Sequence, residues 1–131
     1  MDQEDAITLR SSVEPYFQSL LRIIAGFGLA CHGVQKLLAI QGGAHLPPLL
    51  VVAALLEAVG GFLLFIGLFS STVAFILSGE MAVAYFMRHF PKGFLPIKNG
   101  GEPAVLYCFI FLYLFAAGAD AMSIDRLMRG K

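Results

Sequence analysis

Four hydrophobic segments fill most of this chain, and each is about long enough to cross a lipid bilayer. A spanning helix needs about 20 mostly apolar residues, so all four segments qualify. Each segment also carries at least one ionisable residue, and a charge in hydrocarbon is costly unless a partner neutralises it. The sequence therefore predicts an all-α protein, an antiparallel four-helix transmembrane bundle with its charged groups facing inward. The predicted helices cover residues 17–40, 49–69, 71–90 and 103–122.

The composition indicates one integral membrane domain over residues 1–131. Hydrophobic residues make up 58% of the chain and charged residues only 14%, which is far from the balance of a soluble domain. The nine basic and nine acidic residues cancel and form no basic stripe, so nothing points to nucleic acid as a partner. We expect the lipid bilayer as the main partner, with other membrane protein subunits or a second copy of the chain beside it.

The polar segments outside the four helices indicate how the helices begin and connect. The first 16 residues are polar and lack the basic start of a cleaved signal, so we expect them to be retained. Proline is tolerated in a first helical turn, and Pro15 therefore places the start of the first helix near Tyr16 or Phe17. Ser70, Ser71 and Thr72 are candidate N-caps for the third helix. The connection at 91–101 is rich in turn-forming residues and is predicted to be a mobile lid.

The distribution of basic residues indicates an orientation. Four spans place both termini on one side of the membrane. The side that carries the termini then holds five basic residues against four on the other, which favours cytoplasmic termini under the positive-inside rule. We expect a multi-pass protein of the cell membrane. The two sets are Arg10, Arg22, Arg126, Arg129 and Lys131 against Lys36, Arg88, Lys92 and Lys98.

Helical geometry groups the charged residues of the first two helices on particular faces. Successive residues turn by about 100°, so Arg22, His32 and Lys36 fall within an arc of roughly 80° on the first helix. That arc also carries glycines, whereas the opposite face is apolar and can contact lipid. Glu57 shares its side of the second helix with small residues that let helices approach closely, so it is predicted to point inward.

Depth in the antiparallel arrangement gathers most of these charges into one polar cluster. The cluster has two interpretations. In the first, ion pairs such as Lys36 with Glu57, together with Arg22 with Asp120 at the other end, only fix the helix register. In the second, the cluster lines a pocket for a small ligand or for protons, reached from the 91–101 loop. The site residues of that second interpretation are His32, Lys36, Glu57, Glu80, Arg88 and Glu102.

The chain carries no recognisable catalytic or cofactor motif. It has no Ser-His-Asp order, no zinc or haem signature and no phosphate-binding loop, so no catalytic residue, metal ligand or intrinsic cofactor is assigned. Cys31 and Cys108 form no CxxC pair. We expect both to be free thiols, with a disulfide between the first and fourth helices as the alternative.

The order of several short motifs resembles the DoxX family of small four-helix membrane proteins. The resemblance covers about residues 17–128. It rests on His32-Gly33 followed by Lys36-Leu37, on Leu56-Glu57 with Gly60-Gly61 and Gly67-Leu68, on Glu102, and on Gly118 followed by Ser123-Ile124-Asp125. Asp120 and Glu80 depart from the family pattern, because one stands in a usually small, glycine-rich stretch and the other is an extra acid in mid-membrane.

The resemblance implies a place in a membrane oxidoreductase system. Family members resemble or accompany the small subunit of a thiosulfate:quinone oxidoreductase in the bacterial inner membrane. This implies a subunit or accessory protein that acts with quinone or sulfur compounds, and quinone is the cofactor that the resemblance implies. The residues alone leave two alternatives open, a non-enzymatic structural subunit of a larger membrane complex and a pathway for small solutes or protons.

Overall fold

The computed structural model describes residues 1–130, and every regular element among them is helical, which confirms the all-α class. Within this range, three helices are long and apolar enough to cross a membrane: the first, the second, and the third with its extension to Lys92. The elements are α1 (Gln3–Gln41), α2 (Pro48–Ile66), α3 (Ser70–Ala84), the π-helical turn η1 (Tyr85–His89), the 3-10 turn η2 (Phe90–Lys92), α4 (Pro96–Asn99), α5 (Glu102–Ala117) and α6 (Ile124–Arg129).

Helix α1 begins at Gln3, well before the start predicted near Phe17. The side chain of Asp2 accepts a hydrogen bond of 2.8 Å from the backbone N–H of Asp5, which caps the first turn. Acidic residues in that turn also oppose the positive end of the helix dipole. Pro15 lies inside the helix rather than in its first turn, so the prediction from Pro15 was wrong.

Helices α1 and α2 form an antiparallel pair in backbone contact. A Cβ atom placed on Gly33 would collide with the backbone of Ala54 and Ala58, and one placed on Gly61 would collide with that of Ala30. Close approach of this kind is typical of small residues between membrane helices. The predicted small-residue faces of these two helices therefore do meet, and they fix the register that sets Lys36 opposite Glu57.

Helices α3 and α5 form the second close pair, joined by the turns η1 and η2 and by α4. The Ser78 hydroxyl donates a hydrogen bond of 2.8 Å to the carbonyl of Cys108 across this pair. Helix α5 ends at Ala117, because Gly118 takes a φ of 77°, so the predicted helix 103–122 was too long. With 16 residues, α5 is about 24 Å long, shorter than a typical hydrocarbon core of about 30 Å.

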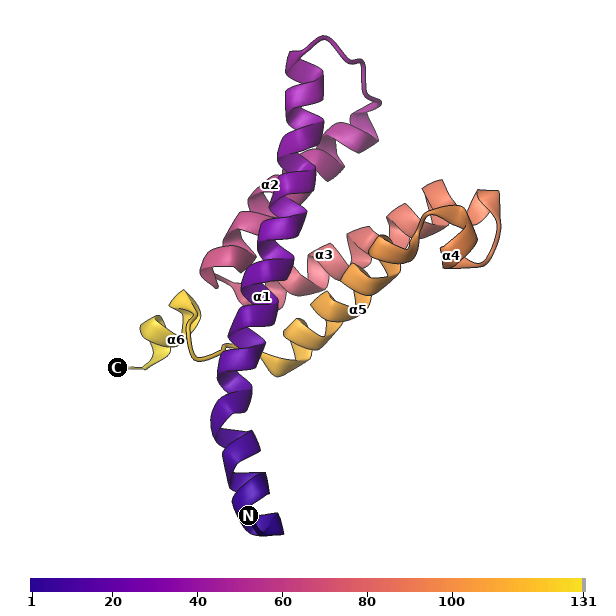
Figure 1. The fold of residues 1–131 in the computed structure, drawn as a ribbon. Coiled ribbons are helices and arrows are strands. Elements are labelled where there is room, and N and C mark those ends of the chain that lie inside the picture. Colours follow the sequence, from indigo (N-terminus) through magenta and orange to yellow (C-terminus); the bar gives the residue numbers. More distant parts are fainter. Residues whose placement is uncertain (131) are drawn as a thin grey trace.

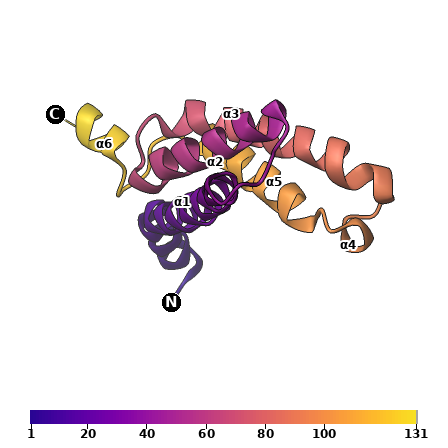
Figure 2. The same ribbon diagram turned by 90° about the horizontal axis from the view of Figure 1, so that it is seen from above.

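The two pairs meet near the α2–α3 turn and diverge from there (Figure 1). The pair α3–α5 runs away from α1 toward α4, and the view from above agrees (Figure 2). Contact between α1 and α5 is sparse compared with contact inside each pair. The N-terminal part of α1 projects past the rest of the chain, and α6 lies beside the end where the pairs meet (Figure 1). We call that end the vertex. The name cleft is kept for the two adjoining cavities lined by Lys36, Glu57 and Arg88.

Candidate functional site

Arg22 is the centre of the vertex. Its side chain is 1% exposed, and its guanidinium donates five hydrogen bonds, which matches the five N–H groups that arginine carries. Two of them reach the carboxylate of Asp120, with Nε at 2.6 Å from Oδ2. The others reach the carbonyls of Leu64, Phe65 and Met122, so one side chain ties α1 to the end of α2 and to the segment after α5.

Asp120 is as fully paired as Arg22. Burial opposes its ionisation, but hydrogen bonds from Arg22, from the Ser19 hydroxyl and from the Met122 N–H outweigh that effect and hold the pKa of Asp120 below its usual range. The predicted ion pair of Arg22 with Asp120 is thus present. Asp120 does not lie in the predicted continuous helix 103–122, and it reaches Arg22 because Gly118 ends α5.

Asp125 completes the vertex by capping α3. Its two carboxylate oxygens accept hydrogen bonds of 2.7 Å from the backbone N–H groups of Phe69 and Ser70. These N–H groups belong to the first turn of α3, where a carboxylate also complements the helix dipole. The cap of α3 therefore comes from a residue 55 positions further along the chain than Ser70. The prediction of Ser70, Ser71 and Thr72 as caps was wrong.

The cleft holds most of the other ionisable residues predicted for the site. A cavity of about 740 Å³ lies between α2 and α3, and a second cavity of about 380 Å³ lies toward α1 and α5. Five residues line both cavities, so the two are parts of one cleft. The parts that the two cavities do not share differ in their lining. The α2–α3 part is lined mainly by aliphatic side chains, whereas the α1–α5 part also carries histidine and tyrosine. The shared residues are Lys36, Leu50, Glu57, Ala84 and Arg88.

Lys36 and Glu57 form an ion pair inside the cleft. The Lys36 Nζ lies 2.7 Å from Oε1 and 2.8 Å from Oε2 of Glu57. The glutamate side chain is 5% exposed, whereas that of the lysine is 38% exposed. The sequence predicted this contact from the inward face of α2. Unlike the vertex pair, it borders an open cavity on one side.

Glu80 lies in the same cleft with its carboxyl group buried. Neither carboxylate oxygen has a hydrogen-bond partner among residues 1–130. Its nearby charges are Glu57 and Lys36. Glu57 and Glu80 both line the larger cavity, so a molecule in that cavity meets two carboxyl groups and one ammonium group. A buried acid without a partner is uncommon enough in proteins to indicate a functional site.

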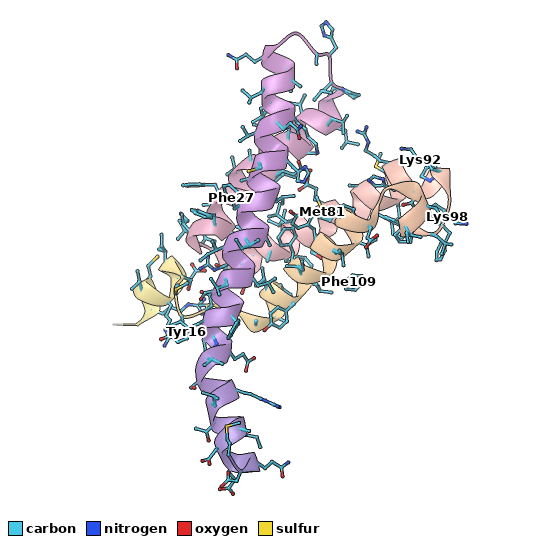
Figure 3. The ribbon with its side chains drawn as sticks, in the orientation of Figure 1. Tyr16, Phe27, Met81, Lys92, Lys98 and Phe109 are labelled. Carbon is cyan, nitrogen blue, oxygen red and sulfur yellow. The ribbon has the colours of Figure 1, made fainter. Side chains whose placement is uncertain are left out.

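The remaining polar groups of the cleft come from α1, from the π-helical turn and from α5. His32 packs edge to face against Tyr107 with ring centroids 6.3 Å apart, and both line the smaller cavity. Arg88 and His89 come from η1, a π-helical turn of the kind often found at functional sites. Figure 3 shows Met81, which also lines this cavity, toward the interior of the molecule, with Phe27 and Phe109 on the outer sides of α1 and α5.

Asn99 shapes the connection that follows η1, although sequence reasoning assigned it no role. Its side-chain amide donates to the Tyr85 hydroxyl at 3.1 Å and to the Gly93 carbonyl at 2.8 Å, and its Oδ1 accepts from the Gly101 N–H. His89 contacts its carbonyl through Nδ1. The sequence does contain a signal for this network, because the turn-forming run Asn99-Gly100-Gly101 follows Tyr85 and His89. The network orders the segment that the sequence predicts to be a mobile lid.

Two other expectations about the site differ from the structure. Glu102 does not line the cleft but an apolar groove of about 470 Å³ between α1 and α5, where it is exposed. The 91–101 connection lines neither cavity, and Leu46 and Pro47 of the first loop line them instead. The described cysteines, Cys31 and Cys108, are both free. Among residues 1–130, no three His, Cys, Asp or Glu side chains are grouped to hold a metal ion.

Comparison with known proteins assigns the chain to a family. The sequence profile of the family described as DoxX matches residues 17–90, which is more than half of the chain. This protein belongs to the DoxX family. An uncharacterized protein of Haemophilus influenzae is 46% identical to it over 120 residues, which cover 85% of this DoxX chain and 90% of the relative. No solved structure matches the chain.

The matched region contains most of the cleft. Residues 17–90 of this DoxX protein include the part of α1 that packs on α2, all of α2 and α3, and the turn η1. His32, Lys36, Glu57, Glu80 and Arg88 therefore lie inside the match. The latter half of the motifs quoted for the resemblance, from Glu102 onward, lies outside it.

Proposed function

We propose that this DoxX protein is a subunit or accessory protein of a membrane oxidoreductase system and that its cleft binds a quinone. The observation that carries the proposal is a cavity of about 740 Å³ in which an ion pair and an unpartnered carboxyl group meet aliphatic walls. Pockets for small hydrophobic ligands combine apolar walls with a few polar groups that fix orientation. Conversely, a cluster that served packing alone would have no reason to border a cavity.

The residues of the cleft fit the chemistry of a quinone. Its carbonyl oxygens need hydrogen-bond donors, and Lys36, Arg88 and His32 supply them around the shared part of the cleft. Its apolar chain needs a hydrocarbon path, and the exposed side chains of Val52 and Ile76 mark the opening between α2 and α3. A bound quinone would supply the electron and proton carrier that an oxidoreductase system in the membrane requires.

The same proposal specifies how the chain sits in the cell membrane. The four segments cross it in alternating directions, with α5 as a short fourth span, and both termini face the cytoplasm. A cysteine-free background with single cysteines at Ser12, His45, Lys98 or Gly130 tests this with an impermeant thiol reagent on intact cells. We expect labelling only of the cysteines introduced at His45 and Lys98. Labelling of Ser12 and Gly130 alone would reverse the orientation, and a split between the termini would refute four spans.

Quinone binding is tested by purification in mild detergent, followed by mass spectrometry of the small molecules and proteins that remain bound. We expect a quinone in the native protein, and at least a fivefold loss in Arg88→Gln. Arg10→Gln is the matched control, because Arg10 is also exposed and lines neither cavity. The proposal fails if no quinone is found or if Arg88→Gln retains as much as the control.

A structural subunit is the second candidate, and one observation favours it. The Lys36–Glu57 pair is complete in itself, since both carboxylate oxygens accept from Nζ, as they would in a pair that only fixes helix register. A partner protein that co-purifies in fixed proportion, without any small molecule and with no effect of Arg88→Gln, would select this candidate. The third hypothesis, a pathway for solutes or protons, predicts ion flux in liposomes that contain only this protein.

A further inference from the structure

A negative charge on Glu80 would have no cation of its own among residues 1–130. Within this described part of the chain, the only ammonium group that acts on it is that of Lys36, which is already bound to both oxygens of Glu57. The two carboxyl groups thus share one neutralising charge. An ionised carboxylate without hydrogen-bond donors is strongly disfavoured in a buried site, so a charged Glu80 is not a stable occupant of this position.

The other polar groups around the cleft do not supply the missing partner. Arg88 of η1 lines both cavities but makes no ion pair in the described structure, and its side chain is exposed. His32 of α1 and Tyr107 of α5 line only the smaller cavity, whereas Glu80 lines the larger one. Neither Arg88, His32 nor Tyr107 forms a hydrogen bond with the Glu80 carboxyl group among residues 1–130.

A proton on Glu80 resolves both the charge and the hydrogen-bond deficit. A protonated carboxyl group is neutral and gains one O–H donor, and a neighbouring carboxylate is a strong acceptor for it. Glu57 is that neighbour, and its own charge is balanced by Lys36. Glu80 lines the larger cavity, so its buried carboxyl group lies beside the cleft.

We propose that Glu80 holds one exchangeable proton in the cleft, next to the Lys36–Glu57 pair. The part of this inference that concerns a ligand rests on the proposed function: Glu80 then transfers its proton from Oε to an oxygen in the cleft. In that step the carboxyl O–H bond breaks, a new O–H bond forms on the acceptor, and Glu80 becomes a carboxylate. No electron moves with it. Glu80 is thus the proton donor and acceptor of the site, whereas Glu57 positions it.

Infrared spectroscopy of the ligand-free protein in lipid nanodiscs tests the proton directly. A protonated carboxyl group gives a C=O stretching band apart from that of carboxylates, and the band shifts in D₂O if the proton exchanges. At neutral pH we expect one such band in the native protein and none in Glu80→Gln, which keeps the size and neutrality of the side chain. Glu102→Gln is the matched control, because Glu102 is exposed to the surroundings, and it should retain the band.

Three results would overturn the inference: no band in the native protein, an unchanged band in Glu80→Gln, or a band that does not shift in D₂O. Glu80→Met serves as a second variant if Glu80→Gln does not fold, and it should also lack the band. The outcome is independent of quinone. A band that belongs to Glu80 in a protein that retains no quinone refutes the proposed function alone, while retained quinone with an unchanged band in Glu80→Gln refutes this inference alone.

Discussion

The vertex and the cleft each contain an ion pair between distant parts of the chain, yet the two pairs are built differently. At the vertex, the side chains of Arg22 and Asp120 are 1% and 0% exposed, and every N–H of the guanidinium has an acceptor. In the cleft, the Lys36 side chain is 38% exposed, and the pair borders a cavity and an unpartnered acid. Complete pairing identifies a structural element, and incomplete pairing beside a cavity identifies a candidate site.

The difference in burial between the two ion pairs also predicts which pair contributes to stability and which to binding. Removing one member of a fully buried pair leaves an uncompensated charge that has no route to water. The ammonium of Lys36 can extend toward the cleft opening, so a loss there is partly relieved by solvation. Substitutions at the vertex should therefore affect folding, while those in the cleft should affect what the cleft binds.

Arg22→Met should give the largest effect. It leaves Asp120 buried and ionised without its partner, which costs about 3–5 kcal/mol of unfolding free energy. Thermal or denaturant unfolding of the purified protein in detergent measures it. Arg10→Met on the exposed start of α1 is the control, with an expected change within about 0.5 kcal/mol. If both variants lost the same small amount, the vertex would not be the fixed end of the molecule.

Lys36→Met should rank second. It leaves Glu57 without a cation beside Glu80, and we expect a loss of about 1.5–3 kcal/mol, typical of hydrogen bonds to charged groups. Glu57→Gln should cost less, because the freed lysine can reach water. The same unfolding measurement applies to both. A larger loss in Glu57→Gln than in Lys36→Met would contradict the difference in exposure between the two side chains.

The pH dependence of the vertex should be confined to acid conditions. The pKa of Asp120 lies lower in the folded protein than the usual value of about 3.9, so its contribution is fully present above that value and is lost as pH falls through the folded pKa. The stability difference between the native protein and Asp120→Asn should then be constant from about pH 8 to 5 and shrink below about pH 4. A difference that changes around pH 6 or 7 would assign the effect to another group.

His32→Gln should have the smallest effect on stability, within about 0.5 kcal/mol, because His32 is exposed. If the cleft binds a quinone, His32→Gln should still weaken binding roughly fivefold to tenfold, because glutamine keeps a hydrogen-bonding group but cannot take up a proton. Quinone retention across the pH range of histidine titration measures this. His45→Gln in the exposed first loop is the control. Unchanged retention in His32→Gln would remove His32 from the site.

Sequence reasoning predicted the helical class and the pairing of Lys36 with Glu57 because both depend on regular geometry. A fixed turn per residue placed the small and charged residues of α1 on one face, and the glycines of α2 indicated which face of that helix is buried. The same helical period predicted that Glu57 faces the neighbouring helices. These predictions needed only the helical period and the cost of an unpaired charge in lipid.

What the sequence could not predict depends on breaks in that regularity. Helix α5 is apolar on all sides, so no pattern fixes its rotation, and Glu102 was therefore assigned to the wrong surroundings. Gly118 ends α5 early and turns Asp120 back to Arg22, although nothing in the apolar run marked that stop. The π-helical turn at Arg88 could not be predicted either, because no pattern of hydrophobic residues marks it. It rotates the side chains that follow by part of a turn relative to a regular α-helix.

The length of α1 has a consequence for anything attached to the start of the chain. A helix of 39 residues is about 58 Å long, nearly twice the thickness of a hydrocarbon core of about 30 Å. Its polar first turns stand beyond the packed part of the molecule (Figure 1). A water-soluble reporter domain fused there through a short rigid joint would be held at a set height above the lipid instead of swinging on a tether. Energy transfer between that domain and a dye in the lipid head groups would then measure how far the start of α1 extends beyond the membrane.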